Sequence, residues 1–412
     1  MLRSYLKLAW KVMWRRKFFT AISLFGISFT LVGLMVATAL LDHMFAPYPP
    51  EVRQDRTLGI YRAELTGGKS GWHSFAGFKL LDRYARDLPG VERLAITGNP
   101  EEVYSYQGGS RVKLFIRRSD AEYWRVLDFR FLEGGPFTDQ DVSNGAFVAV
   151  INASTRDRFF GGPPAVGRTI EADGQHFRVI GVVPDLPILR QISFAEIYVP
   201  LTTAKTDAYR EQLLGGFTGL LLARSPADFP AIKAEFASRL PQVPLPNKRW
   251  EKLTSQASTH FEYAAEMLVP GETSESKLAL MWALIAGMML LFALLPAVNL
   301  VNLNMSRIME RASEIGVRKA FGASSRTLVG QFIVENVVLA LVGGALGFTG
   351  SVLVLEAVNR SGLVPYAQFG VNYRIFLYGL GLAVFFGVFS GVYPAWRMSR
   401  LHPVQALKGA SR

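Results

Sequence analysis

The chain has 412 residues, of which 50% are hydrophobic, and it contains no cysteine. The lack of cysteine excludes disulfide bonds, thiolate zinc sites and a cysteine nucleophile, and it suits a domain outside the cytoplasm. The net charge of +12 also occurs in nucleic-acid-binding proteins, but here the excess of Lys and Arg lies beside apolar runs, which is the positive-inside pattern of membrane proteins and argues against a nucleic-acid partner.

Residues 1–17 are basic and aromatic and predict an amphipathic helix at the cytoplasmic membrane surface. Leu6, Trp10, Met13 and Trp14 fall on one face at helical spacing. Trp and Arg are the residues that settle at the level of the lipid head groups, so this helix is expected to lie in the interface.

Residues 18–41 form the first apolar run and predict a transmembrane helix, because a span needs roughly 20 such residues. The alternative is a signal peptide, since the flank is basic and Ala37-Thr38-Ala39 resembles a cleavage site. The apolar region of a signal peptide covers only about 7–15 residues, which favours the membrane anchor.

Residues 42–277 form a large polar block that predicts an α+β domain outside the membrane. Short β-branched runs predict buried strands, and prolines fit the first turn and the end of a later helix. The expected strands cover residues 90–97, 112–117, 147–152 and 177–183, and the expected helices cover residues 75–88, 121–127 and 230–240.

Three further apolar runs predict the second, third and fourth spans, at residues 278–303, 328–356 and 375–394. Pro296 removes one helical hydrogen bond and is expected to kink the second span. Residues 357–374 are expected to form the turn outside the membrane between the last two spans.

The charged loop at residues 304–327 and the basic tail at residues 395–412 place both chain ends and this loop in the cytoplasm. The predicted fold is therefore a polytopic α-helical membrane protein with four transmembrane helices. Its large α+β extracytoplasmic domain is inserted between the first and second helices.

The loop at residues 304–327 retains helical order, because Ile308, Ala312 and Ile315 form one apolar stripe. Gly322 suits the end of a second short helix, and Ser324 suits the cap of the next one. Two short helices held between spans would form a stiff lever, although the residues alone equally allow an ordinary basic cytoplasmic loop.

An ordered series of residues runs from this loop into the third span. It consists of Glu310-Arg311, then Glu314-Ile315-Gly316-Val317-Arg318-Lys319-Ala320-Phe321-Gly322-Ala323-Ser324, then Glu335, then Gly343-Gly344-Ala345-Leu346-Gly347. This series resembles the signature of the MacB/FtsX-type (type VII) ABC transporter permeases. The resemblance implies that Glu310, Arg311 and residues 314–324 form a coupling helix that docks on a separate ATPase.

A second patch lies in the polar block. Its phrases at residues 127–137, 150–154, 160–162, 166–170 and 177–183 resemble, in order, the periplasmic core domain of MacB-type permeases. By that analogy an inserted lobe would cover roughly residues 110–215. The tail from Pro394 resembles the family's C-terminal motif, with a loose register around Met398.

The resemblance implies a non-catalytic permease subunit without a fused ATPase. It implies that two copies of an ABC ATPase, which bind ATP and Mg²⁺ themselves, drive movement of the periplasmic domain, called mechanotransmission, to export a periplasmic or outer-leaflet substrate. It further implies a second permease (self or paralogue), often an adaptor and an outer-membrane duct, contact with membrane lipids, and a place in the bacterial inner membrane.

Small and polar residues in the spans carry further expectations. Gly343 with Gly347, and Gly387 with Gly391, form GxxxG pairs that favour close helix packing. Glu335 is expected to have an interhelical or loop-facing partner, with proton transfer as the alternative. The asparagines at the cytoplasmic end of the second span either bond across helices or end the span; they are Asn299, Asn302 and Asn304.

No catalytic, cofactor-binding or metal-binding residues are predicted. The five histidines are dispersed, and Gly68-Lys69-Ser70 lacks the preceding glycine of a phosphate-binding loop. Two alternatives to an exporter stay open. One is a regulator in which the same lever activates an extracytoplasmic hydrolase or senses a ligand, and the other is a membrane-anchored enzyme with its active site in the polar block.

Overall fold

The computed structural model describes residues 2–15, 17–107, 109–271, 273–310 and 325–399. The chain divides into two compact units. A helical unit contains residues 1–43, 280–363 and 368–412, and an external domain contains residues 44–279 and 364–367.

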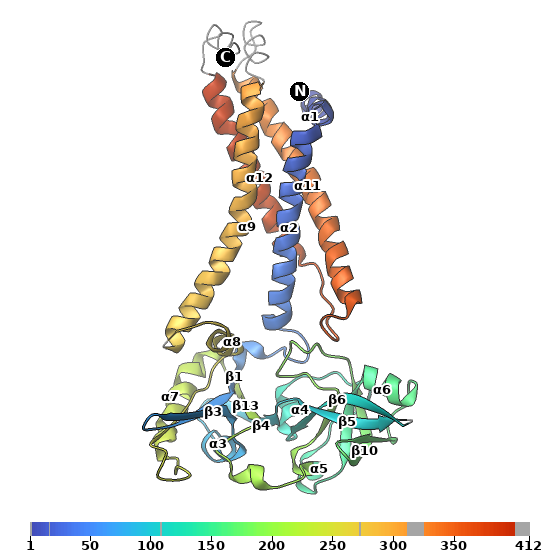
Figure 1. Cartoon of the computed structure of the whole chain (residues 1–412), viewed down its shortest axis with the longest axis vertical. Helices are drawn as coiled ribbons and strands as arrows, with labels where there is room; N and C mark the ends of the chain where they lie inside the picture. The colour runs from blue at the N-terminus through green and yellow to red at the C-terminus, as the bar shows by residue number, and fades with distance from the viewer. Residues whose placement is uncertain (1, 16, 108, 272, 311–324, 400–412) are drawn as a thin grey trace. The chain divides into compact units, whose positions relative to one another are not determined.

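The helical unit is built from one amphipathic helix and long apolar helices (Figure 1). They are α1 (Leu2–Arg15), α2 (Lys17–Phe45), α9 (Ser274–Glu310), α11 (Ser325–Ser361) and α12 (Tyr373–Ser399). The predicted interfacial helix and apolar helices therefore form as helices.

Three helical segments in the described part of the chain are long and apolar enough to cross a membrane. They are Lys17–Phe45, Ser274–Phe292 and Val329–Ser361. The apolar segment of α12, Tyr373–Phe389, is shorter. These helices fit a membrane permease, while the count of four spans stays a prediction.

The helix α2 packs closely on α11 because glycines face it. A Cβ atom at Gly343 would lie 2.9 Å from Ile27, and one at Gly347 would lie 2.9 Å from the Cβ of Leu31. Only a residue without a side chain allows the two backbones this approach. Ile27 and Leu31 also belong to a buried apolar cluster that includes Phe376 of α12.

The external domain is organised around one 14-stranded sheet. Its main path runs β14-β2-β3-β13-β4-β6-β11-β8-β10-β7, and β1, β12, β5 and β9 pair alongside β13, β3, β6 and β10. The strands are β1 (Thr57–Ile60), β2 (Arg62–Gly67), β3 (Ser70–Ala76), β4 (Val91–Gly98), β5 (Glu101–Gln107), β6 (Ser110–Ser119), β7 (Glu133–Gly134), β8 (Val148–Asn152), β9 (Thr169–Ala172), β10 (Gln175–Val183), β11 (Ile197–Pro200), β12 (Leu214–Gly215), β13 (Phe217–Ala223) and β14 (Lys252–Ser255).

Short helices cover this sheet. They are α3 (Phe78–Tyr84), α4 (Glu122–Val126), α5 (Asp139–Ser143), α6 (Ala153–Phe160), α7 (Phe229–Arg239) and α8 (His260–Leu268). The predicted strands correspond to β4, β6, β8 and β10, and two predicted helices correspond to α4 and α7. The helix predicted at residues 75–88 is wrong at both ends, because Phe75 and Ala76 belong to β3 and the helix ends at Tyr84.

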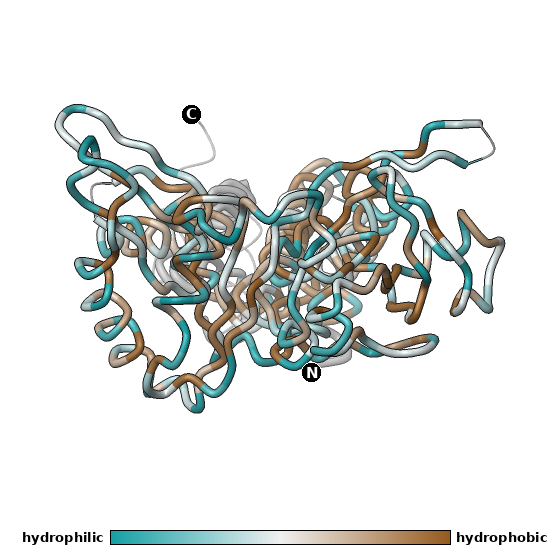
Figure 2. Tube along the Cα trace, turned by 90° about the horizontal axis from the view of Figure 1, so that it is seen from below, coloured by the Kyte–Doolittle hydropathy of each residue, from teal (hydrophilic) through white to brown (hydrophobic). Residues whose placement is uncertain are grey.

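Different parts of the sequence supply the two ends of the sheet. At one end of the sheet, the late strands β13 and β14 pair with the early strands β1–β4. The strands β5–β11, which lie between β4 and β13 in sequence, build the other end. Hydrophobic residues run along the strands in the interior, and hydrophilic residues prevail in the outer loops (Figure 2). Because the sheet is continuous, the lobe boundaries at residues 110 and 215 stay a prediction.

Candidate coupling site

The predicted coupling residues lie largely outside the described chain. Glu310 is the last residue of α9, and residues 311–324, which include Arg311 and the whole stretch from Glu314 to Ser324, are outside the described residues. The coupling helix therefore stays a prediction.

The predicted residues of the later spans are placed. Glu335 is buried on α11 and accepts a hydrogen bond of 2.7 Å from Gln331, one turn earlier on the same helix. Gly343 and Gly347 face α2, and Gly387 is buried on α12, the helix that also carries Gly391.

The external domain holds a set of contacts that the sequence did not reveal. They centre on residues 184–196, which connect β10 to β11 and are called the β10–β11 loop below. This loop contacts two segments of the domain that continue directly into helices of the helical unit. One is residues 46–51, which follow α2, and the other is residues 364–367, which belong to the turn between α11 and α12.

The first contact is a buried ion pair. Arg190 of the loop lies 3.2 Å from the carboxylate of Glu51, and their side chains are only 2% and 4% exposed. Arg190 also donates to the carbonyl of Ala46 at 3.1 Å, and Ser193 donates to Glu51 at 2.5 Å. A charge buried this deeply is costly unless it is paired, so the pair holds the segment after α2 against the loop.

The second contact joins the loop to the turn between α11 and α12. The hydroxyl of Tyr366 donates to the buried carboxylate of Glu196 at 2.6 Å, and the other oxygen of Glu196 accepts from the amide of Phe115 at 2.9 Å. The amide of Ile188 donates to the carbonyl of Pro365 at 3.4 Å. Burial, and then the neighbouring Glu196, raise the pKa of Tyr366, so its hydroxyl stays protonated and able to donate.

The start of α9 is anchored to the domain through α8. The ring of Tyr263 on α8 stacks on Tyr61 with centroids 4.1 Å apart. Glu266, near the end of α8, accepts from the hydroxyl of Ser274, the first residue of α9, at 3.1 Å. Burial raises the pKa of Glu266, and the Ser274 hydroxyl partly offsets this.

The segment after α2 and the turn between α11 and α12 are thus tied into the domain by buried or half-buried contacts, and the start of α9 is tied to it by an exposed hydrogen bond. Sequence reasoning missed Glu51, Arg190, Glu196 and Tyr366. One signal was present, because Arg190 and Glu196 are the only charged residues between positions 186 and 200. An isolated charge in an apolar run is a reason to expect a buried partner.

The contacts at the β10–β11 loop link segments of the external domain to one another. Within the described residues, no group of three or more His, Asp or Glu side chains could hold a metal ion. The anchoring contacts are one ion pair and several hydrogen bonds, which occupy both carboxylate oxygens of Glu51 and of Glu196. Arg190 Nε is buried and has no hydrogen-bond partner among the described residues. The anchoring contacts make the β10–β11 loop the place where the segment that follows α2 and the turn between α11 and α12 are both bonded to the external domain.

Family models match sequence in both the external domain and the helical unit. Residues 20–239 match the model described as the MacB-like periplasmic core domain, and residues 286–403 match the FtsX-like permease C-terminal model. The crystal structure of the periplasmic region of MacB from Actinobacillus actinomycetemcomitans aligns with a TM-score of 0.37 and 16% identity, covering 52% of this chain and 94% of that one.

Curated relatives align over 66% to 98% of the chain. The pyoverdine export ATP-binding/permease protein PvdT of Pseudomonas entomophila is 26% identical over 412 residues, which are 98% of this chain and 59% of that protein. The macrolide export ATP-binding/permease protein MacB of Bdellovibrio bacteriovorus is 28% identical over 284 residues, which are 66% of this chain and 40% of that protein. The chain thus spans less than two thirds of the length of these relatives.

The first family model alone covers more than half of the 412 residues, and the second covers most of the remainder. These matches confirm the resemblance predicted from the two sequence patches. The chain belongs to the MacB/FtsX-type permeases, with a MacB-like periplasmic core domain and an FtsX-like permease C-terminal region.

Proposed function

We propose that this chain is the permease subunit of an ABC transporter, in which ATP hydrolysis on an ATP-binding partner moves the external domain. In this proposal the domain lies in the periplasm, four helices cross the inner membrane, and both chain ends are cytoplasmic. Two permeases act with two ATP-binding subunits, which hold the ATP and Mg²⁺. An adaptor and an outer-membrane duct would complete the path.

The observation that carries the proposal is the pair of anchors on the β10–β11 loop. A displacement of the helices can reach a remote domain only through contacts that stay intact while the helices move. Such coupling also needs a two-state element whose equilibrium is shifted from both sites. The Arg190–Glu51 pair and the Tyr366–Glu196 bond meet this need on the segments that follow α2 and connect α11 to α12. Pro47, Pro49 and Pro50 further stiffen the first of these segments.

The substrate is proposed from the relatives. Their names record export of pyoverdine and of macrolides, so pyoverdine and macrolides are the first compounds to test. We expect deletion of the gene to lower efflux of such a compound, and the intact chain to restore it. A deletion that changes cell-wall cleavage and leaves efflux unchanged would favour the regulatory alternative.

Movement of the domain can be measured directly because the chain contains no cysteine. A single spin label at Gln140→Cys, an exposed site on α5, reports the distance between the two copies in a reconstituted transporter. We expect ATP and Mg²⁺ to shift this distance distribution, and Arg190→Gln to abolish the shift while ATP hydrolysis continues. Transport with an unchanged distance distribution would overturn mechanotransmission.

Docking of the ATP-binding subunit is tested separately at the cytoplasmic loop. Exchanging Arg318 and Lys319 for Glu reverses two charges in the proposed coupling helix. We expect the variant to recover much less ATPase in a pull-down from native membranes. Glu substitutions at Lys7 and Lys11, which lie in the amphipathic helix, change the charge equally and serve as the control. Equal recovery by both variants would contradict docking at this loop.

A further inference from the structure

The external domain contains a groove of about 410 Å³ that no part of the coupling argument uses. The strands β2, β3 and β14 line one side of it, and the end of α8 and the first turn of α9 line the other. Its lining residues all belong to the external domain, and all but one of their side chains are half-buried or exposed. The volume falls in the range for small-molecule pockets, about 300–1,000 Å³, and a molecule that enters can reach the polar groups of the walls.

Two cations line the groove without a carboxylate partner. Arg62 of β2 donates to the sulfur of Met267 at 2.9 Å, and a thioether is only a weak acceptor. Lys277 lines the groove from the first turn of α9. Among the described residues, neither cation forms an ion pair. Both side chains are half-buried, so each keeps N–H donors for a molecule in the groove.

A carboxylate lies near these cations on the floor of the groove. Glu64 is exposed, and it forms no ion pair within the described part of the chain. The strand register places it opposite His73 of β3 and Thr254 of β14, so the three side chains share one face of the sheet. Arg62 projects from the same face, because residues two apart in a strand point the same way.

Glu266 of α8 supplies a second carboxylate. One of its oxygens accepts from the hydroxyl of Ser274 at 3.1 Å and from the side-chain amide of Gln256. Burial raises the pKa of Glu266, and the Ser274 bond, Lys277 and Arg62 counter that rise. The Glu, Lys and Arg side chains of the lining therefore have no net formal charge. A ligand with a single charge would disturb this balance, whereas a zwitterion would preserve it.

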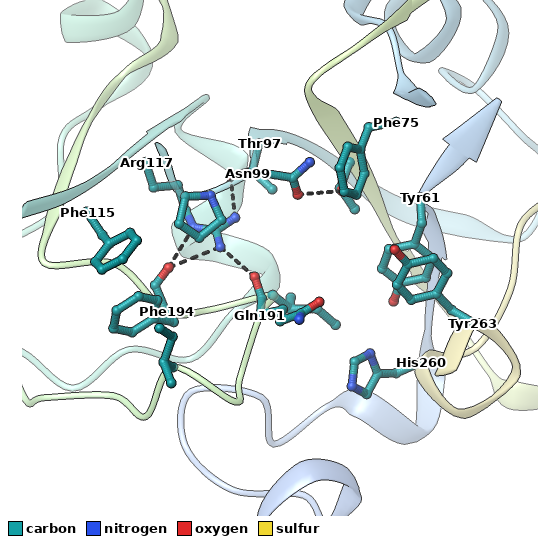
Figure 3. Close-up of a pocket in the computed structure, with 14 residues that line it drawn as sticks. Tyr61, Phe75, Thr97, Asn99, Phe115, Arg117, Gln191, Phe194, His260 and Tyr263 are labelled. Carbon is teal, nitrogen blue, oxygen red and sulfur yellow. Dashed lines mark hydrogen bonds between the residues drawn. The ribbon is translucent and has the colours of Figure 1, made fainter. Parts of the chain in front are cut away.

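Contacts outside the groove hold its walls in place. Tyr263 of α8 stacks on Tyr61, which directly precedes β2, with ring centroids 4.1 Å apart (Figure 3). Ser255 of β14 donates to the carbonyl of Arg62 at 2.7 Å and fixes the floor. A site whose walls are already ordered loses less conformational freedom when a ligand binds.

We propose that this groove binds a small zwitterion of dipeptide size. Its carboxylate accepts from Arg62 and Lys277, and its ammonium group donates to Glu64. The Cα atoms of Arg62 and Glu64 are about 6–7 Å apart along β2, and each residue of an extended chain adds about 3.3–3.6 Å, so the two ends of a dipeptide span this separation. The bound molecule would join the sheet to the first turn of α9, which carries Lys277.

The test uses a zwitterionic dipeptide and two singly charged forms of the same molecule. They are 4-fluorophenylalanyl-alanine, its N-acetyl derivative, which is an anion, and its C-terminal amide, which is a cation. Binding to the purified full chain in detergent is followed at neutral pH by broadening of the ¹⁹F signal, with empty micelles as the blank. We expect the zwitterion to bind at least about 10-fold more tightly than either singly charged form, because it makes one more charge-assisted hydrogen bond.

Two variants of the lining should change the charge preference of the groove. Glu64→Gln removes the partner of the ammonium group, so the zwitterion should lose its advantage over the N-acetyl anion. Lys277→Gln removes a partner of the carboxylate, so the zwitterion and the anion should both weaken while the amide cation does not. Lys69→Gln, in the exposed turn between β2 and β3 outside the groove, is the control and should change none of the three. Thermal unfolding verifies that each variant is folded.

The outcomes decide the proposal without reference to ATP-driven transport, because the binding measurement needs neither ATP nor a partner subunit. A preference for the zwitterion that is lost in Glu64→Gln and Lys277→Gln but kept in Lys69→Gln supports the site. Equal binding of all three probes, binding no greater than that of empty micelles, or a preference that is the same in Glu64→Gln and Lys69→Gln would overturn it.

Discussion

The contacts inside the helical unit differ in kind from the contacts inside the external domain. In the helical unit, glycines of α11 let α2 approach closely, and the hydroxyls of Ser28 and Thr30 donate to carbonyls of their own helix. In the external domain, buried charges join segments far apart in sequence, as between Glu51 and Arg190. The first kind depends on shape and the second on pairing, so different substitutions should break each.

The difference bears on the proposed mechanism. Helices that pack by shape can be displaced together as stiff bodies without breaking polar bonds. Buried charge pairs in the domain resist separation, because each partner left alone would be an uncompensated charge. In the proposed mechanism, movement would thus pass from closely packed helices to a loop that is fixed by a buried ion pair. Four predictions test these contacts.

The largest effect is expected from breaking the buried ion pair. Arg190→Gln leaves Glu51 as a buried charge, and we expect the external domain to lose about 3–5 kcal/mol of stability. Arg210→Gln, whose pair with Asp207 is exposed, is the control and should cost no more than about 1 kcal/mol. Chemical denaturation of the full chain in detergent measures both.

The same pair allows a sharper comparison. Replacing both Glu51 and Arg190 with Met removes both charges and keeps the site apolar, so the double variant should be more stable than Arg190→Gln. Equal stability of Arg190→Gln and Arg210→Gln would mean that the pair does not hold the segment after α2.

The packing between α2 and α11 is tested by adding a side chain. Gly343→Leu places atoms against Ile27 and should destabilise the helical unit by about 1–3 kcal/mol. Gly330→Leu on the same helix meets nothing within 4 Å and should have little effect. A thermal-shift measurement in detergent that finds the two variants alike would count against close packing at Gly343.

The turn between α11 and α12 is tested by removing one hydroxyl. Tyr366→Phe deprives the buried Glu196 of one hydrogen bond, and we expect a loss of about 1.5–2 kcal/mol. It should also reduce the ATP-driven change in spin-label distance while leaving ATPase recovery intact. The control is Tyr106→Phe at an exposed ring, and a Tyr366→Phe transporter that moves like this control would exclude the turn from the route.

The last prediction concerns the pH dependence of stability. Burial raises the pKa of Asp120 from 3.8 to about 7, although the amides of Ile96 and Tyr123 donate to it and partly lower it. Between these two pH values the folded domain binds this proton more tightly than the unfolded chain, so the contribution of Asp120 to stability falls as the pH rises.

Asp120 keeps some contact with solvent, which reduces the effect of its pKa shift on stability. We therefore expect stability to fall by about 2 kcal/mol between pH 4 and pH 8. Asp120→Asn should flatten the pH dependence of stability by that amount, and Asp207→Asn at an exposed carboxylate should not. Denaturation curves collected across this range measure the slope, and identical slopes for Asp120→Asn and the unchanged chain would show that Asp120 does not titrate there.

Some elements were predictable because they repeat a local pattern. The run at residues 177–183 is short and β-branched, which indicates a buried strand, and β10 is found there. The start of α3 was misplaced because Phe75 and Ala76 are equally compatible with a helix and with β3. The strand β13 was not predicted, since a short apolar run that contains Gly219 does not distinguish strand from helix.

The sequence by itself determined the family, the apolar helices and the alternation of apolar and polar blocks, because motifs and hydrophobic periodicity are local properties of a chain. Only the tertiary structure decided which charges meet. Glu51 and Arg190 lie 139 residues apart, and Glu196 and Tyr366 lie 170 apart. A contact between distant segments leaves no periodic pattern in either one, and so it is visible only after folding.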